Sequence, residues 1–142
     1  MKACTIYKTN REYKIITVYQ RESEILHQRD PVFIIPITSS NEKLSKCIFN
    51  SLNSSGTIKE SELITTKELL KLIKAPSFKS LYKNSTSCMI FLSKGKLELI
   101  PYKEAKDRGL EEVNEDKKTI DYTKENESLI ITTIVEMLNR KY

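Results

Sequence analysis

The first three strand-forming patterns of this sequence precede its first helical pattern, and that order limits the folds open to the chain. Residues 12–20 (EYKIITVYQ) are rich in β-branched and aromatic types in alternation, which predicts a strand with one face well buried and the other partly buried. Residues 4–8 and 31–37 predict two further strands, and Pro36 favours an edge position or a bulge for the second. A sheet formed in this way needs helices from later in the chain to cover it.

Helical patterns follow in the middle of the chain. Ser40 and Asn41 are expected to cap a helix that ends near Ser54-Ser55-Gly56, where Gly56 would adopt a left-handed conformation. A second helix is predicted to be capped by Thr65-Thr66 and to end at Pro76, which cannot continue it. Ser77 caps a short third helix, so three helices are expected between the first strands and the second half of the chain.

The second half of the chain predicts a hairpin and a terminal helix. Residues 87–93 and 96–102 are apolar runs separated by a turn that contains glycine, which is typical of a β-hairpin. Residues 103–118 are polar and predict a long surface excursion. Residues 119–123 predict a short closing strand, and Thr123 is expected to cap a last helix that lies across the sheet.

The order of these elements predicts one α+β domain over residues 1–142, with a mostly antiparallel central sheet and helices packed on it. Strands and helices do not alternate strictly, as they would in a parallel doubly wound fold. The chain has 142 residues, of which 39% are hydrophobic and 30% charged, a balance typical of a globular domain. It has no signal-peptide core and no apolar run long enough to span a bilayer, so we expect a cytoplasmic protein without membrane contact.

The residues that could carry chemistry predict no enzyme, no metal and no cofactor. The single histidine, His27, could act as a general base, but a surface or turn position is the favoured interpretation because no nucleophile signature accompanies it. Cys4, Cys47 and Cys88 lack the close spacing of a zinc site and are expected to be reduced; the last two lie at core spacing. The three glycines stand apart, so no phosphate-binding loop is predicted.

The polar excursion contains a candidate acidic contact surface. Carboxylates gathered there could steer a basic partner and pair with its lysines and arginines. A solvated loop is an equally open interpretation, because basic residues flank these acids. Tyr102, beside the excursion, could serve as an aromatic anchor or could simply pack at the end of its strand. The candidate acids are Glu111, Glu112, Glu115 and Asp116.

A lysine-rich segment offers an alternative surface. Residues 67–83 contain five lysines interleaved with Phe78 and Tyr82, and lysine with aromatic side chains can bind nucleic acid. The favoured interpretation is that the lysines form the solvated sides of amphipathic helices and the aromatics belong to the core. The five are Lys67, Lys71, Lys74, Lys79 and Lys83.

A series of motifs between residues 72 and 139 resembles a known family. These motifs are the short aromatic helix at 77–82, the run Lys83-Asn84-Ser85, the hairpin that ends in Ile100-Pro101, the Gly109 loop and the ending YTKENESLIITTIVEMLN. Together they resemble the immunity proteins of bacterial contact-dependent growth inhibition (CDI) systems. The chain departs from the pattern at Phe78, where a larger aromatic is expected, and at Asn126-Glu127, where a small residue or glycine is expected.

The resemblance implies a partner and a mode of action. Such proteins bind the C-terminal domain of the CDI toxin encoded beside them, often a nuclease, and block it in the cytoplasm. For this chain the resemblance implies a cognate toxin domain as protein partner and no direct contact with nucleic acid. A nucleic-acid-binding module that uses the lysines of 67–83 is the alternative function.

Family members pair with different toxins, so the interface residues cannot be carried over by position. A net charge of +5 would repel a strongly basic toxin unless the acids are concentrated on one face. Either the acidic excursion forms the contact, or the partner is neutral or acidic and the lysines of 67–83 form it.

Overall fold

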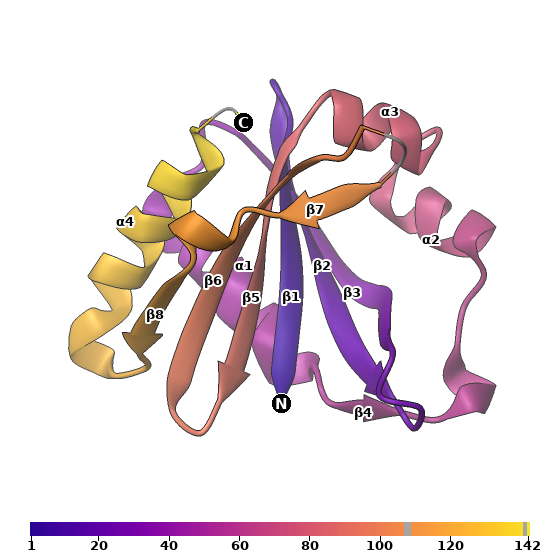
Figure 1. The fold of residues 1–142 in the computed structure, drawn as a ribbon, viewed down its shortest axis with the longest axis horizontal. Helices are drawn as coiled ribbons and strands as arrows, with labels where there is room; N and C mark the ends of the chain where they lie inside the picture. Colours follow the sequence, from indigo (N-terminus) through magenta and orange to yellow (C-terminus); the bar gives the residue numbers. More distant parts are fainter. Residues whose placement is uncertain (107–108, 141) are drawn as a thin grey trace.

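A computed structural model describes residues 1–106, 109–140 and 142, and within them eight strands form one sheet accompanied by four α-helices (Figure 1). The main order of the sheet is β3 (Leu26–Pro36), β2 (Glu12–Arg21), β1 (Lys2–Lys8), β5 (Thr86–Ser93), β6 (Lys96–Glu104) and β7 (Leu110–Glu112). Two short strands lie off this path: β4 (Thr57–Ile58) pairs with β2 in parallel, and β8 (Lys118–Asp121) pairs with β6. The other pairings are antiparallel, which confirms the predicted α+β fold with a mostly antiparallel sheet.

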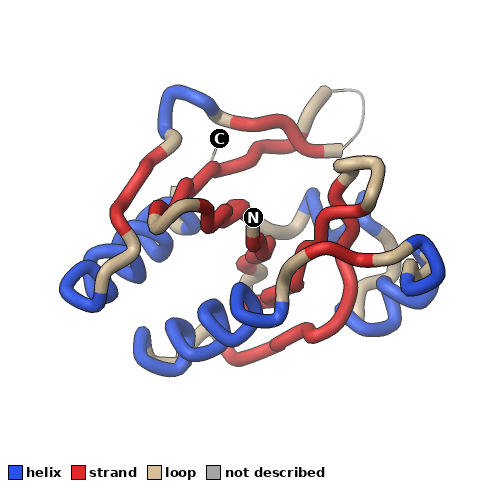
Figure 2. Tube along the Cα trace, turned by 90° about the horizontal axis from the view of Figure 1, so that it is seen from below, coloured by secondary structure: helices blue, strands red, loops and turns tan. Residues whose placement is uncertain are grey.

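Helices cover both faces of the central strands (Figures 1 and 2). Residues of α1 (Asn41–Ser54) and α4 (Glu127–Leu138) pack in one apolar cluster with Ile15 of β2, whereas α2 (Thr66–Ile73) and α3 (Phe78–Lys83) pack in a second cluster with Ile16. Successive side chains of a strand point to opposite faces, so the two clusters lie on opposite sides of the sheet.

The β2 strand is buried more completely than its sequence predicted. Every residue from Tyr13 to Val18 is buried, so the expectation of a partly exposed second face was wrong. The reason is the second helical layer, since α2 and α3 cover the face that alternation alone left open. β3 is an edge strand, as Pro36 indicated, but it starts at Leu26, five residues earlier than predicted.

The α1 helix begins where the sequence predicted, but its C-terminal cap differs from the prediction. The Ser40 hydroxyl accepts a hydrogen bond from the Lys43 N–H at 3.1 Å, which caps the N-terminus. Gly56 is not left-handed; the helix ends at an extended Ser55, with φ −69° and ψ 160°. The Ser55 hydroxyl donates to the carbonyl of Val18 and accepts from the N–H of Ala3, so it joins the end of the helix to β1 and β2.

The predicted excursion over 103–118 is partly regular structure. β6 continues to Glu104, and β7 pairs with it antiparallel before a short 3-10 helix, η2 (Asn114–Asp116). The prediction of a simple surface excursion was therefore wrong for these residues, because their backbone groups pair with β6; residues 107–108 lie outside the described part of the chain.

The last helix also begins differently from the prediction. Thr123 does not cap it, because a 3-10 turn (Lys124–Asn126) intervenes and α4 starts at Glu127 without a side-chain cap. Its broad apolar face packs on the sheet, as expected, through residues that include Ile130 and Ile134. The described residues contain no helix with both the length and the apolar character needed to cross a bilayer.

A buried lysine joins α2 to the sheet. Lys14 of β2 is 5% exposed, and its ammonium donates to the carbonyls of Ile73 at 2.7 Å and Lys74 at 3.1 Å. These carbonyls lie at the C-terminus of α2, where helical carbonyls lack partners and the helix dipole favours a cation. Glu12 lies 3.6 Å from the same ammonium and offsets its charge. Lys14 therefore holds the second helical layer in place.

We predict that Lys14→Met lowers the free energy of unfolding by about 2 kcal/mol, because hydrogen bonds from a charged donor are lost while the aliphatic stem is kept. Urea denaturation followed by circular dichroism measures the change. Lys71→Met, at an exposed position of α2, is the matched control and should leave stability nearly unchanged. Equal unfolding midpoints for the two variants would show that the Lys14 contact contributes nothing.

Candidate binding surface

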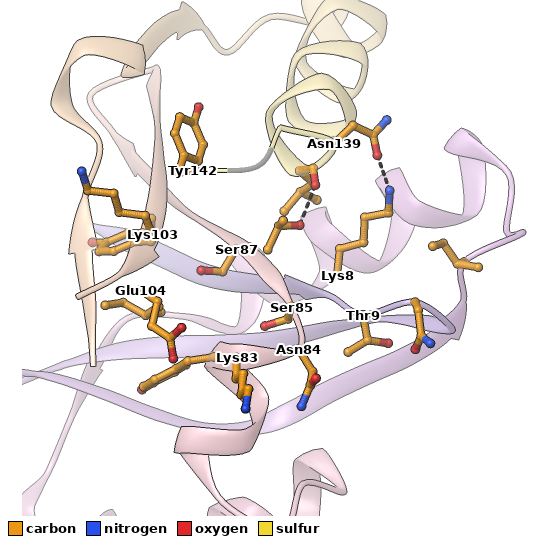
Figure 3. A pocket seen from close by; sticks show the side chains of 17 residues that line it. Lys8, Thr9, Lys83, Asn84, Ser85, Ser87, Lys103, Glu104, Asn139 and Tyr142 are labelled. Atoms are coloured by element: carbon orange, nitrogen blue, oxygen red, sulfur yellow. Dashed lines mark hydrogen bonds between the residues drawn. The ribbon is translucent and has the colours of Figure 1, made fainter. Parts of the chain in front are cut away.

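A polar hollow of about 560 Å³ opens at one end of the sheet (Figure 3). The end of β1, the start of β5, the end of β6 and the C-terminal ends of α3 and α4 meet there. Its lining combines cationic, amide, hydroxyl and phenol groups, among them Lys8, Lys83, Asn139, Ser87, Tyr82 and Tyr102. Polar side chains that converge on one hollow can recognise a partner by hydrogen bonding.

Hydrogen bonds hold one wall of this hollow together. The ammonium of Lys8 donates to the side-chain carbonyl of Asn139, and the Thr86 hydroxyl donates to the backbone carbonyl of Leu138 (Figure 3). These contacts join β1 and β5 to the end of α4, although the residues lie 131 and 52 positions apart in the chain. The wall is thus formed by tertiary structure rather than by one local motif.

The structure brings Tyr102 and two of the predicted acids together. Tyr102 of β6 pairs across the sheet with Glu112 of β7, and its hydroxyl donates to the Glu112 carboxylate at 3.5 Å. Burial, followed by the Glu112 carboxylate, raises the pKa of Tyr102 to about 12, so the phenol stays a neutral donor. Glu111 lies 3.6 Å from the ammonium of Lys103, its cross-strand partner.

The other two predicted acids lie at η2 and differ in their surroundings. Asp116 accepts a hydrogen bond from the Tyr142 hydroxyl at 2.7 Å and lies 3.3 Å from Arg140. The Tyr142 hydrogen bond, with a smaller contribution from Arg140, lowers the pKa of Asp116. Glu115 is exposed and belongs to no ion pair within residues 1–106, 109–140 and 142.

We define the acidic rim as Tyr102, Glu111, Glu112, Glu115 and Asp116, which lie on β6, β7 and η2. Three of its four carboxylates already have partners within the chain. Tyr102 also lines the polar hollow, so the rim borders that hollow. These carboxylates remain available to a partner. An exposed ion pair contributes little to stability, so exchanging it for a contact with the partner costs little free energy.

The five lysines of 67–83 are all exposed on α2 and α3. Phe78 and Tyr82 are partly buried and pack against the second core cluster, and their ring centroids lie 5.7 Å apart. The Tyr82 ring also stacks on Tyr7 at 6.2 Å. The lysines are therefore solvated, as predicted, whereas the two aromatic side chains are partly buried and pack against the core rather than inside it.

His27 lies on β3 rather than in a turn. Its Nε2 accepts a hydrogen bond from the N–H of Ile64 at 3.1 Å, which joins β3 to the segment before α2. Burial lowers the pKa of His27, and the nearby cations Arg21 and Arg29 lower it further. The neutral imidazole therefore has a structural role. Its Nε2, the nitrogen that would accept a proton in general-base catalysis, already accepts the Ile64 hydrogen bond.

The cysteines are packed in or against the first core cluster. Burial raises the pKa of Cys4 and raises that of Cys88 to about 12; it also raises the pKa of the half-buried Cys47. These thiols stay protonated and unreactive near neutral pH. In the part of the chain that the structure describes, no three His, Cys, Asp or Glu side chains are placed to hold a metal ion.

Sequence reasoning assigned no role to most residues of the polar hollow. Lys8, Thr86 and Asn139 come from three distant elements and carry no local signal of a shared site. The run Lys83-Asn84-Ser85 was the available signal, because it belongs to the family-like pattern and all three residues line the hollow (Figure 3).

The fold and this surface are those of an α+β domain with a polar contact face, and comparisons with known proteins identify its family. The family model described as CdiI, CDI immunity protein, matches residues 2–129. The chain therefore belongs to the CDI immunity protein family, as its motifs indicated. No curated protein matches the chain.

Two solved structures share the fold. A Neisseria meningitidis protein of unknown function superposes with a TM-score of 0.77 at 18% identity, covering 99% of this chain and 95% of that one. A chain of the CdiA-CT/CdiI toxin and immunity complex from Yersinia pseudotuberculosis superposes with a TM-score of 0.71 at 9% identity, covering 97% of each chain. At these identities the likeness shows the fold.

We predict that acidification destabilises this protein through His27. Its folded-state pKa lies below the unfolded value near 6.5, so the unfolded chain binds the proton more tightly. The stability that the neutral ring contributes is complete above about pH 6.5 and is lost as the pH falls through the folded-state pKa. Unfolding midpoints in urea between pH 7.5 and 5 should therefore fall more steeply for the natural protein than for His27→Gln, which can accept the Ile64 hydrogen bond without titrating.

Proposed function

We propose that this chain is the immunity protein that binds and neutralises the C-terminal toxin domain of its own CDI system. The observation that carries this proposal is the family match over residues 2–129, which spans nearly all of the described chain. The fold shared with a chain of a toxin and immunity complex supports a toxin domain as the partner. Residues 1–142 would act together as one immunity domain.

The proposed mechanism is occlusion, without a chemical step by the immunity protein. The groups that could serve as nucleophile or base are engaged elsewhere: Cys4 and Cys88 are buried thiols with raised pKa values, and His27 holds Ile64. A sheet whose strands β1 and β2 are buried on both faces offers a preorganised surface, which limits the conformational entropy lost on binding. A tight complex of this kind buries roughly 1,600 Å² in total.

The proposed contact surface includes the acidic rim and the adjoining polar hollow. A nuclease toxin presents cations that bind the phosphates of its substrate, and Glu111, Glu112, Glu115 and Asp116 fit such a surface by charge. Tyr102, half-buried between rim and hollow, would provide the aromatic anchor. Neutralisation would take place in the cytoplasm, where a nuclease meets its substrate.

We predict that the double reversal Glu112→Lys/Glu115→Lys weakens binding of the toxin domain encoded beside this chain at least about tenfold, because like charges then face each other across the contact. Isothermal titration calorimetry with the purified domain gives the dissociation constant. The same variant should lose protection in a growth assay with the toxin expressed in the cell.

The control is Glu22→Lys/Glu24→Lys, which makes the same charge change at two exposed residues of the β2–β3 turn. Unchanged affinity in the rim variant, with tight binding by the natural protein, would remove the acidic rim from the interface. Failure of the natural protein to bind or neutralise the toxin domain would instead contradict the proposed function.

A further inference from the structure

The positive charge of this protein is concentrated on α2 and α3. Residues 66–83 contain five lysines and one glutamate, so this segment supplies four of the five net positive charges of the chain. All five ammonium groups belong to exposed residues, and none takes part in an ion pair in the portion of the chain that the structure describes. The carboxylates of the acidic rim, by contrast, are mostly paired.

Helix geometry determines which side of α2 carries its lysine side chains. Lys67 and Lys71 are four residues apart, which places them on one side of α2, and Lys74 follows as the left-handed C-cap of that helix. The buried side of that helix carries Leu69 and Ile73, and Lys14 holds its C-terminus to the sheet. The lysines therefore form a fixed outward surface rather than a flexible tail.

The lysine face, defined as Lys67, Lys71, Lys74, Lys79 and Lys83, contains two hollows. One, of about 590 Å³, lies between α2 lysines and Leu70, Ala75 and Pro76. The other, of about 720 Å³, lies between Lys79, Lys83 and the end of β6, with Phe78 and Tyr82 in its wall. Hollows of this kind can accept side chains that project from the surface of a folded partner.

The chemistry of the face favours carboxylates over nucleic acid. Single-stranded nucleic acid is bound by aromatic rings that offer a free face for stacking, but Tyr82 already stacks on Tyr7 and packs against Phe78. The segment contains no arginine, the side chain whose planar fork binds phosphate through two hydrogen bonds. A lysine ammonium pairs with carboxylates and phosphates alike, so it is the lack of free stacking rings and of a planar fork that favours a protein partner here.

We propose that the lysine face docks an acidic surface of the toxin domain; this contact rests on the proposed function. The β6–β7 connection adjoins α3, because Glu104, Ala105 and Gly109 line the same hollow as Lys79 and Lys83. Lys83 of the lysine face and Tyr102 of the acidic rim line the same polar hollow, so the proposed contact would extend across that hollow from a basic part to an acidic part. A partner with complementary halves binds in one orientation only, and its approach is accelerated by long-range attraction.

The test compares two triple variants in stopped-flow association with the purified toxin domain. Lys67→Glu/Lys71→Glu/Lys74→Glu reverses the α2 part of the face, and Lys43→Glu/Lys94→Glu/Lys124→Glu makes the same net charge change at exposed lysines on α1, the β5–β6 turn and the turn before α4. At low salt the first variant should associate at least about tenfold more slowly than the natural protein, and the control should retain most of the rate. The difference should shrink at high salt as the charges are screened.

Each other outcome contradicts the proposal. Equal rates for the natural protein and the α2 variant, or equal losses in both variants, would show that the lysine face makes no specific contact. Unchanged toxin binding together with salt-sensitive RNA binding that the α2 variant loses would assign the face to nucleic acid instead. If the natural protein does not bind the toxin domain at all, the proposed function fails, and the assignment of this face to the toxin fails with it.

Discussion

The structure depends on the burial of its central strands from both sides. Ile15 and Ile16 are neighbours in β2, and both are fully buried although they point to opposite faces of the sheet. Burial on that scale requires two helical layers, because a strand exposed on one face would leave half of these side chains in water. The layer of α1 and α4 is large and apolar, whereas the layer of α2 and α3 is smaller and also relies on the polar contact of Lys14.

That second layer links stability to function. Lys14 satisfies the terminal carbonyls of α2, so the same helix that completes the core also presents a surface rich in lysine. At the other end of the sheet, β7 and η2 carry carboxylates that are paired with side chains from β6 and the C-terminal segment. The groups with reactive chemistry, by contrast, are held inside: the Cys4 and Cys88 thiols are buried, and His27 is hydrogen bonded to the backbone. This arrangement agrees with the occlusion mechanism proposed above.

Local pattern predicted much of this fold because several elements are specified by nearby residues. The β5–β6 hairpin was predictable from two apolar runs and their turn, and the helices after Ser40, Thr65 and Ser77 begin where their capping side chains indicated. Predictions failed where a distant partner decides the conformation. The α1 helix ends at Ser55 because that hydroxyl bonds to β1 and β2, and β7 forms because β6 offers it free backbone groups.

The sequence alone determined the class of fold, the family and the absence of a familiar catalytic motif, since these follow from periodicity, capping and recognisable runs such as Lys83-Asn84-Ser85. The acidic rim was also visible as a run of carboxylates, but its internal pairing was not. Only the tertiary structure decided that His27 is a structural acceptor and that Lys14 is buried, because both contacts join residues at least 37 positions apart. It also decided that Lys83 and Tyr102 border the same hollow, because chain folding, and not sequence distance, sets which side chains become neighbours.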